Sequence, residues 1–512
     1  MKLAARTLFS LLLLAPLGGT FAYAQNSNVQ HVIVVFQENR TPDNLFQDQN
    51  LTKAGADIVP PATGGHCDTY QIPLIPRPLA DCYSPQHFHK SWTTMYHNGA
   101  MDGACRIVVN YGNGCEAGVP ACSDHNYAHC PQYAYVDNSN LGIQPYWDIA
   151  ETYGFANYMF QTSQGPSFPA HQFILSGTSA PTVTVTPYYT YFAAENMNNG
   201  NNLDAGCIAS PDQSVNLIDP LGNEGVTMYP CFEHPTLTDL LEQYGITWRY
   251  YGDAAASIWT APTAISHICG ASGGNCMGSD WTGHVVVEKQ NNLAPFLSDL
   301  GNCNLNQVTW VIPDGRWADH PLENQGWGPD WVADIVNGVG NSGCTNPDGT
   351  TYWNTTVILI AWDDWGGFYD HVSPQNTIGI GYSNNTGGQY VHGFRVPLLV
   401  VSPYVKLTNG QPGYISGLQP NPIYYDFGSI LRFIEETFLP GAPAPYINPS
   451  YPYADELISN GADLSDFFNY GQGPRQFVPI KLGPYPTPPC DANCFINWQG
   501  QPMALDDDGT GP

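Results

Sequence analysis

The sequence predicts an α/β fold in which helices cover both faces of a mostly parallel β-sheet. Several short apolar runs are rich in β-branched residues and lack the alternation of a half-exposed strand, which indicates strands covered on both faces. These runs are residues 32–36, 308–312, 357–361 and 398–401. Segments with helical character lie between them, and alternating strands and helices are typical of an α/β sandwich.

Three segments carry helix signals. Residues 236–245 begin with Thr236, which can cap a helix, continue with an acid three residues later and end at a glycine. Residues 328–338 fit a second helix. In residues 426–438 the large apolar side chains fall on one face, and Asp426 is the expected cap.

Two long segments interrupt the alternation of strands and helices. Residues from about 50 to 145 and from about 180 to 230 are rich in Gly, Pro, Asn, Tyr and Cys. We expect them to be disulfide-braced insertions of a single domain, residues 25–460. Residues 461–512 are Pro-rich and are predicted to form a C-terminal tail that wraps the domain and frays at its end.

The first 24 residues have the composition of an export signal peptide. Lys2 and Arg6 give a positive start, residues 8–17 are apolar but too short to span a bilayer, and residues 22–24 (Ala-Tyr-Ala) form a small-x-small cleavage site. The mature chain is therefore expected to begin near Gln25 and to be secreted or periplasmic. No later apolar run reaches spanning length, so no integral membrane association is expected.

The charge balance is strongly acidic. The chain has 15 Lys and Arg against 44 Asp and Glu, a formal net charge of −29. Loss of Lys2 and Arg6 with the signal would leave 13 basic residues and a net charge of −31. Such a surface repels nucleic acid and anionic lipid, so no nucleic-acid partner is expected, and its self-repulsion falls in acidic surroundings.

The chain has 14 cysteines. An even number behind an export signal favours disulfides over free thiols or zinc. Plausible local pairs are Cys269 with Cys276 and Cys490 with Cys494. Residues 122–130 contain two Cys and two His, but their spacing matches no trusted zinc pattern, so a bridged loop is the preferred interpretation.

Polar side chains are concentrated where two predicted strands end. Glu38 and Asn39 follow the first strand, and Asp363 and Asp364 follow the third, beside a Gly-Gly pair. In parallel sheets ligands bind beyond the carboxyl ends of the strands. Three carboxylates and one amide oxygen suit a hard divalent cation, without which the carboxylates would repel one another. We therefore predict a metal site, with the metal unknown; helix capping or a solvated loop is the alternative for either cluster alone.

Ser167 lies between two prolines at the start of an apolar stretch with helical character. Backbone N–H groups and the dipole at a helix N-terminus favour an anion, which suits a nucleophile that attacks phosphorus. From spacing alone, a plain helix cap is the favoured interpretation of Ser167. Pro169 prevents a complete Gly-x-Ser-x-Gly elbow, and the chain lacks both a nucleotide phosphate loop and the paired-His helix of zinc proteases.

Four histidines could complete a phosphate site, although any one of them alone is more often structural. They are His87, His89, His320 and His371.

Taken together, these segments resemble the family of bacterial acid phosphatases and phospholipases C, which includes the plant non-specific phospholipases C. The matching segments follow the family's order between residue 31 and about residue 440. They are residues 38–41 (Glu-Asn-Arg-Thr), 84–87 (Ser-Pro-Gln-His), 98–102 (Asn-Gly-Ala-Met-Asp), 165–169 (Gly-Pro-Ser-Phe-Pro), 176–178 (Ser-Gly-Thr), 319–321 (Asp-His-Pro), 363–372 (Asp-Asp-Trp-Gly-Gly-Phe-Tyr-Asp-His-Val), 395–398 (Arg-Val-Pro-Leu) and 401–403 (Val-Ser-Pro).

The resemblance implies an alkaline-phosphatase-like α/β/α fold with a metal-dependent catalytic site. By this resemblance Ser167 is the nucleophile, while His87 and His320 contact phosphate or transfer protons. The implied metal ligands are Glu38, Asn39, Asp363 and Asp364. Roles for His89 and His371 are implied more weakly.

The sequence departs from the family pattern at three positions near these groups. Ala170 stands where many members have Asn, which would remove a polar contact near the nucleophile. Ser84 replaces a common Asp, and Trp365 replaces a common His, which would make the pocket less polar. These departures bear on substrate preference more than on catalysis.

The resulting hypothesis is a secreted, metal-dependent acid phosphatase that hydrolyses small phosphate esters through a phosphoserine. A phospholipase C acting on phospholipid head groups is the main alternative, followed by a sulfuryl or acyl hydrolase. A non-catalytic glycan-binding protein, using its 13 Trp and 31 Tyr, is the remote alternative. A binding module has no need to gather three carboxylates and a serine at a helix start. The sequence does not indicate an oligomeric state.

Overall fold

A computed structural model describes residues 28–483, apart from residues 82, 112–129, 183–190, 199–202, 220, 289–292, 323–325, 375–389, 441–446, 449, 451 and 458–461. The predicted export signal, residues 122–129 of the possible bridged loop and the predicted Cys490–Cys494 pair lie outside the described residues.

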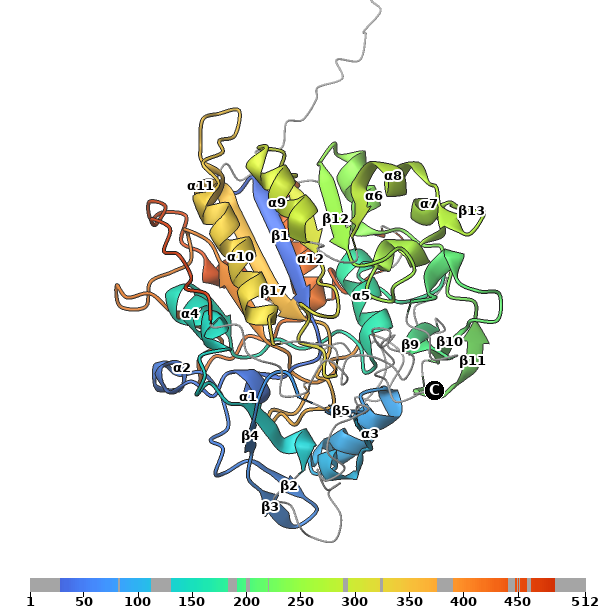
Figure 1. Cartoon of the computed structure of the whole chain (residues 1–512), viewed down its shortest axis with the longest axis vertical. Coiled ribbons are helices and arrows are strands. Elements are labelled where there is room, and N and C mark those ends of the chain that lie inside the picture. The colour runs from blue at the N-terminus through green and yellow to red at the C-terminus, as the bar shows by residue number, and fades with distance from the viewer. Residues whose placement is uncertain are drawn as a thin grey trace, which may run out of the picture.

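A central sheet of eight strands organises the molecule (Figure 1). In spatial order the strands are β15 (Val285–Val287), β12 (Trp248–Gly252), β16 (Val308–Val311), β1 (His31–Gln37), β17 (Thr356–Trp362), β18 (Leu398–Val401), β8 (Gly154–Ala156) and β19 (Tyr414–Ser416). Neighbouring strands run parallel except at β18, which is antiparallel to both β17 and β8. The predicted mostly parallel sheet is therefore confirmed.

The direction of β18 corrects one expectation. Residues 398–401 were expected to be a parallel strand because their apolar run has no alternation. The strand is fully buried as predicted, but it runs against its neighbours. A continuous apolar run reports burial on both faces of the sheet, and burial does not fix the direction of the strand.

Helices pack on both faces of the sheet, which confirms the sandwich (Figure 1). In the view of Figure 1, α9 (Leu293–Gly301) and α10 (Gly328–Asn341) lie in front of the sheet, and α10 also contacts α4 (Gln144–Thr152). Behind the sheet lies α12 (Phe427–Phe438), which contacts α5 (Ser167–Ser176).

The three predicted helices form where they were expected. Thr236 caps α6 (Leu237–Gln243) in a capping box with Asp239, and the turn closes two residues beyond the helix. The second helix, α10, extends to Asn341, three residues further than predicted. Asp426 caps α12, and its backbone N–H donates to the Ser429 hydroxyl at 3.1 Å.

Short elements make up the two segments predicted as insertions. The second contains a small antiparallel sheet of β9, β10 and β11. The bounds in these segments are α2 (Gln49–Ala54), β2 (Gly65–Cys67), β3 (Tyr70–Ile72), β4 (Ile75–Arg77), β5 (Tyr83–Pro85), α3 (His89–Tyr96), β6 (Val109–Tyr111), β7 (Ala134–Val136), β9 (Phe192–Met197), β10 (Val215–Ile218) and β11 (Glu224–Met228). The remaining elements are α1 (Pro42–Leu45), α7 (Ser266–Cys269), β13 (Ala271–Ser272), β14 (Asn275–Cys276), α8 (Ser279–His284) and α11 (Tyr352–Thr355).

Disulfides lie both inside and outside the two predicted insertions. The predicted Cys269–Cys276 pair is confirmed. Further bonds join Cys67 to Cys105, Cys207 to Cys231 and Cys303 to Cys344. Cys130 is also disulfide-bonded, so every cysteine in the part of the chain that the structure describes is paired. In the described part of the expected tail, Phe467 and Ile480 are buried against the core.

Two buried carboxyl groups lie next to each other at α12. Glu435 of α12 and Asp455 are both fully buried, and a side-chain hydrogen bond links them. Burial and then the neighbouring Asp455 raise the pKa of Glu435 well above its usual range. Arg432, 3.9 Å from Glu435, and Glu456 are the nearest other charged groups. The folded protein therefore holds a proton here that an unfolded chain would release.

This pair predicts that replacing Glu435 will flatten the pH dependence of stability. A carboxyl group with a raised folded pKa adds stability that is fully present below the unfolded pKa of about 4.3 and is lost as the pH rises toward the folded pKa. Glu435→Gln keeps the shape and removes the ionisation. Its melting temperature should match the wild type near pH 4 and exceed it increasingly toward pH 8. Glu436→Gln, at an exposed neighbour, is the matched control, and an equal shift at every pH would contradict the prediction.

Candidate active site

The ends of β1 and β17 bring the predicted metal ligands together. The two strands pair in parallel register to Gln37 and Trp362, and the Asp363 N–H donates to the Gln37 carbonyl at 2.9 Å. The residues that follow on each strand therefore leave the sheet at the same edge. All four predicted ligands are fully buried there: Glu38, Asn39, Asp363 and Asp364.

Direct hydrogen bonds join the two strand ends. The Asn39 backbone N–H donates to Asp363 Oδ1 at 2.8 Å, and its side-chain Nδ2 donates to Asp364 Oδ1 at 2.9 Å. Asn39 has a φ of 61°, a left-handed conformation that Asn tolerates better than most residues. This conformation turns both donors of Asn39 toward the aspartates.

Two glycines allow the chain to pack closely around these ligands. A Cβ at Gly366 would lie 2.2 Å from the Asn39 carbonyl oxygen, and a Cβ at Gly367 would lie 2.6 Å from Pro85 Cβ. Both glycines also have positive φ. The Gly-Gly pair therefore lets the loop after β17 touch the end of β1 and the loop that carries His87.

Ser167 lies at the same site, although it follows a strand that is separated from β17 by β18. It is the first residue of α5, which follows β8, a strand that also runs parallel to β17. The fully buried Ser167 hydroxyl donates to Glu38 Oε2 at 3.3 Å and to Asp364 Oδ2 at 3.4 Å. The serine therefore lies between carboxylates that come from both strand ends.

His171 is a site residue that the sequence reasoning did not assign. It lies one turn after Ser167 on α5, and its Nε2 is 2.9 Å from Glu38 Oε1. Burial lowers the pKa of His171 to about 4, so its imidazole is neutral near neutral pH. The i, i+4 spacing from Ser167 was a signal that could have found it, because such residues share a helix face.

The side chains present fit a divalent cation. Ligand atoms of Glu38, His171 and Asp363 lie within 4.8 Å of one another. Asn39 Oδ1 and Asp363 Oδ2 are buried and have no hydrogen-bond partner among the described residues. Because His171 is neutral, it does not compensate the negative charge of the carboxylates. Carboxylates buried away from water need a nearby positive charge. Oxygen-rich ligands of this kind suit hard divalent cations.

His87 and His320 both lie at this site, with ring centroids 5.8 Å apart. His87 Nδ1 donates to the Pro85 carbonyl at 3.0 Å, and His320 Nδ1 donates to the Pro321 carbonyl at 2.7 Å. A carbonyl oxygen can only accept, so these bonds place a proton on Nδ1 of both rings. In the neutral rings Nε2 is then the basic nitrogen, and His87 Nε2 accepts from Asn39 Nδ2 at 3.1 Å.

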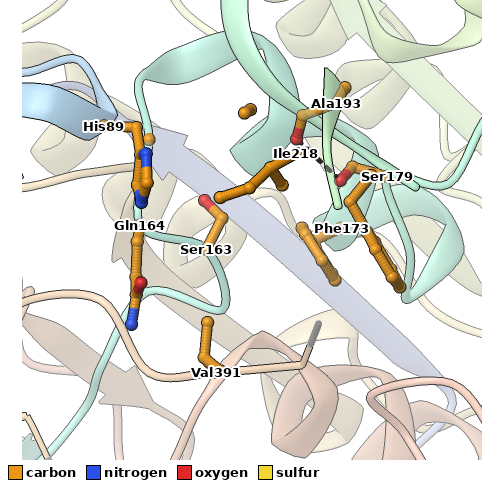
Figure 2. A pocket seen from close by; sticks show the side chains of 11 residues that line it. His89, Ser163, Gln164, Phe173, Ser179, Ala193, Ile218 and Val391 are labelled. Carbon is orange, nitrogen blue, oxygen red and sulfur yellow. Dashed lines mark hydrogen bonds between the residues drawn. The ribbon is translucent and has the colours of Figure 1, made fainter. Parts of the chain in front are cut away.

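His89 lies outside this group. Its Nδ1 pairs with Glu224 Oε1 of β11 at 2.7 Å, and its backbone N–H donates to Glu195 Oε1 of β9 at 3.0 Å. Its ring lines a cavity of about 20 Å³, roughly one water molecule, together with Ser163, Gln164 and apolar side chains of the second insertion (Figure 2). His89 thus connects the two insertions next to the site.

His371 belongs to a separate ionic cluster. It donates to Asp43 at 2.7 Å and to Asp57 at 3.1 Å, and although burial opposes its charge, these acids raise the pKa of His371 to about 10. The buried Arg395 donates to both oxygens of Asp370 at 3.0 Å. Asp43, Asp370 and His371 are close enough to hold a metal, but Arg395 and His371 already supply the positive charge.

The three departures from the family pattern are all fully buried near the site. Ala170 lies on α5, and Ser84 lies on β5. Trp365 packs 6.1 Å from the His87 ring, and its Nε1 contacts Met95 Sδ at 3.1 Å. An apolar indole therefore backs His87 at this point.

The chain belongs to the Phosphoesterase family, whose model matches residues 29–439. The family predicted from the sequence is thereby confirmed, and membership assigns the chain to the hydrolases of phosphoric ester bonds.

Relatives of this chain carry the names of phospholipases C. Hemolytic phospholipase C of Pseudomonas aeruginosa is 23% identical over 88% of this chain and 57% of its own length. Phospholipase C B of Mycobacterium tuberculosis is 21% identical over 88% of this chain and 80% of its own. Non-specific phospholipase C6 of Arabidopsis thaliana is 33% identical over 32% of this chain and 29% of its own length. The chain thus spans little more than half of the Pseudomonas protein.

Among solved structures, the lipoteichoic acid synthase LtaP from Listeria monocytogenes aligns with 61% of this chain and 68% of its own, at 12% identity and a TM-score of 0.27.

The two acidic clusters predict opposite effects of the same kind of substitution. Asp363→Asn should lower the affinity for divalent cations by at least about tenfold, a scale typical of altered metal sites, with little change in stability. Asp370→Asn should leave cation affinity unchanged but cost about 3–5 kcal/mol, because it leaves Arg395 buried with a missing partner. Calorimetric titration with a panel of divalent cations, together with urea unfolding, measures both. Equal loss of metal affinity in the two variants would contradict the assignment.

Proposed function

We propose that this chain is a metal-dependent phosphoesterase that attacks phosphorus with Ser167. The observation that carries the proposal is the position of the Ser167 hydroxyl, 3.3 Å from Glu38 and 3.4 Å from Asp364 at the start of a ten-residue helix. The carboxylates can accept the hydroxyl proton, and the helix N-terminus favours the anionic phosphoryl group.

Glu38, Asn39, Asp363 and Asp364 would hold the divalent cation, with His171 as a further ligand or as the group that orients Glu38. When bound, such a cation stabilises the serine alkoxide and the negative charge on the phosphoryl oxygens. The metal ligands are on the loops after β1 and β17, and only His171 shares an element with the nucleophile.

The proposed reaction has two in-line displacements. In the first, the Ser167 hydroxyl proton passes to the carboxylate of Glu38 or Asp364, and Ser167 Oγ forms a bond to phosphorus as the bond from phosphorus to the leaving oxygen breaks. His320, in its protonated form, gives a proton to that leaving oxygen from Nε2. In the second, water attacks phosphorus and loses a proton to the now neutral His320. The bond from phosphorus to Ser167 Oγ breaks as Oγ takes back its proton from the carboxylate. His87 contacts the phosphoryl group in both steps.

Two substrate classes fit this machinery. A soluble phosphate monoester is favoured by the acidic surface, which opposes anionic membranes, and by burial of every proposed catalytic side chain. A phospholipid is supported at least as strongly, since the relatives are named phospholipases C. A glycan-binding role leaves the buried serine and carboxylates without a purpose.

We further propose a secreted or periplasmic location. The paired cysteines need an oxidising compartment, and the first residues have the composition of an export signal. Over the residues that the structure describes, no helix has the length and apolar character needed to cross a bilayer.

Removal of the nucleophile gives the most direct test. Ser167→Ala should reduce kcat by at least about a thousandfold, the scale seen when a covalent nucleophile is removed, while the melting temperature stays close to that of the wild type. Ser163→Ala, at a buried serine four residues earlier, is the matched control and should retain most activity. If Ser167→Ala kept more than a tenth of the activity, Thr162 or Ser163 would become the candidate nucleophile.

The substrate class can be separated by specificity constants. We expect a higher kcat/KM for p-nitrophenyl phosphate than for phosphatidylcholine in mixed micelles, since the net charge and the buried site favour a small soluble ester. Measurements should run from acidic to neutral pH, with and without chelator, and chelator should abolish both activities. A preference for the lipid at every pH would establish the phospholipase C interpretation instead.

A further inference from the structure

Strand β9 of the second insertion runs directly beside the nucleophile. A Cβ at Gly165 would lie 2.1 Å from the carbonyl oxygen of Ala194, so only glycine allows this approach. Gly165 is two residues before Ser167, and β9 also contacts α5. The strand is therefore held against the turn that leads into the helix.

The Asn196 side chain of β9 reaches the start of α5. It is 1% exposed, and its Oδ1 accepts a hydrogen bond from the Phe168 backbone N–H at 2.8 Å. Because that N–H can only donate, the bond fixes which end of the amide is oxygen. The other end, Nδ2, is buried and has no hydrogen-bond partner among the described residues. A buried donor pair next to the nucleophile is thus available to a ligand.

The residues at the start of α5 indicate what Asn196 Nδ2 could bind. Phe168 directly follows Ser167, and its N–H is already used by Asn196. Pro169 has no N–H, and Ala170 has no polar side chain. The helix start therefore has fewer donors for phosphate than its dipole would favour, and an amide from a different strand can supply one.

The opposite face of β9 is anchored to the loop that carries His87. Successive residues of a strand point to opposite faces, so Glu195 points away from Asn196. Glu195 accepts from the His89 backbone N–H at 3.0 Å, two residues after His87. Figure 2 shows His89, Ser163 and Ala193 of β9 around the cavity at this junction. The strand is thus fixed on both sides, which gives Asn196 a defined position.

We propose that Asn196 is a further catalytic residue, whose Nδ2 donates a hydrogen bond to a non-bridging oxygen of the phosphoryl group while Ser167 attacks. This inference rests on the proposed function and extends it by one substrate contact. It assigns a role in the reaction to the second insertion, which supplies none of the groups that the sequence indicated. The alternative is that Asn196 only caps α5 and does not contact the substrate.

Asn196→Asp separates the two roles. The variant keeps an oxygen for the Phe168 N–H but replaces the donor with an acceptor that repels phosphate. We expect kcat for p-nitrophenyl phosphate to fall by about a hundredfold, the scale for loss of one oxyanion donor. The melting temperature should also fall, because a carboxylate replaces a neutral amide at a buried position, but the variant should remain folded at the assay temperature. The inhibition constant of orthovanadate, an analogue of the pentacoordinate phosphorus, should rise by a similar factor.

Asn157→Asp is the matched control. Asn157 is equally buried, but both ends of its amide are used, by the Asp57 N–H at 2.8 Å and the Gly55 carbonyl at 3.1 Å. It should lose stability and retain kcat. Asn196→Ala, assayed well below its melting temperature, should show the same loss of kcat as Asn196→Asp and guards against misfolding of one variant.

The outcomes distinguish this inference from the proposed function. If Asn196→Asp and Asn196→Ala stay within about threefold of wild-type kcat and vanadate affinity, Asn196 is only a cap and the inference is wrong. If instead Ser167→Ala remains active, the proposed nucleophile fails, and direct calorimetric titration of vanadate into wild type and Asn196→Asp still decides whether Asn196 binds the phosphoryl analogue.

Discussion

The parallel pairing of β1 with β17 is the constraint on which the rest of the site depends. It ends two strands side by side and places three carboxylates in a buried, crowded position. Burial of like charges is unfavourable, and neighbouring groups donate hydrogen bonds to these carboxylates. Asn39 donates to both aspartates, His171 donates to Glu38, and the Ser167 hydroxyl bridges the two strand ends. These neutral donors add no positive charge, which the proposed cation would supply.

Much of the architecture could be predicted from the sequence, because burial leaves a simple pattern. Apolar runs without alternation located the central strands, and caps such as Thr236 and Asp426 located helix starts. The direction of β18 could not be read in this way, since its residues are as buried as those of a parallel strand. Strand order likewise depends on contacts between residues far apart in the chain.

The candidate site was predictable to the extent that its residues sit next to strand or helix ends. Glu38 and Asp363 follow buried strands, and Ser167 starts a helix, so local signals marked them. The position of His171 could be predicted only if it were known that α5 faces Glu38. The position of Asn196 depends on the path of an insertion whose sequence has no repeating pattern. His371 shows the converse: it lies in a matching segment, yet its partners are the acids around Arg395.

The chain separation of the site residues has a consequence for the timing of activity. Asn39 and Asp364 are 325 residues apart, and the groups around them come from both insertions and from the loop after β16. No segment of the chain carries a working fragment of the centre, so closure of these long loops must precede any chemistry. A polypeptide that crosses a membrane unfolded would therefore have no hydrolytic activity in the compartment where it is made. Activity would arise only after the chain has folded around the central sheet.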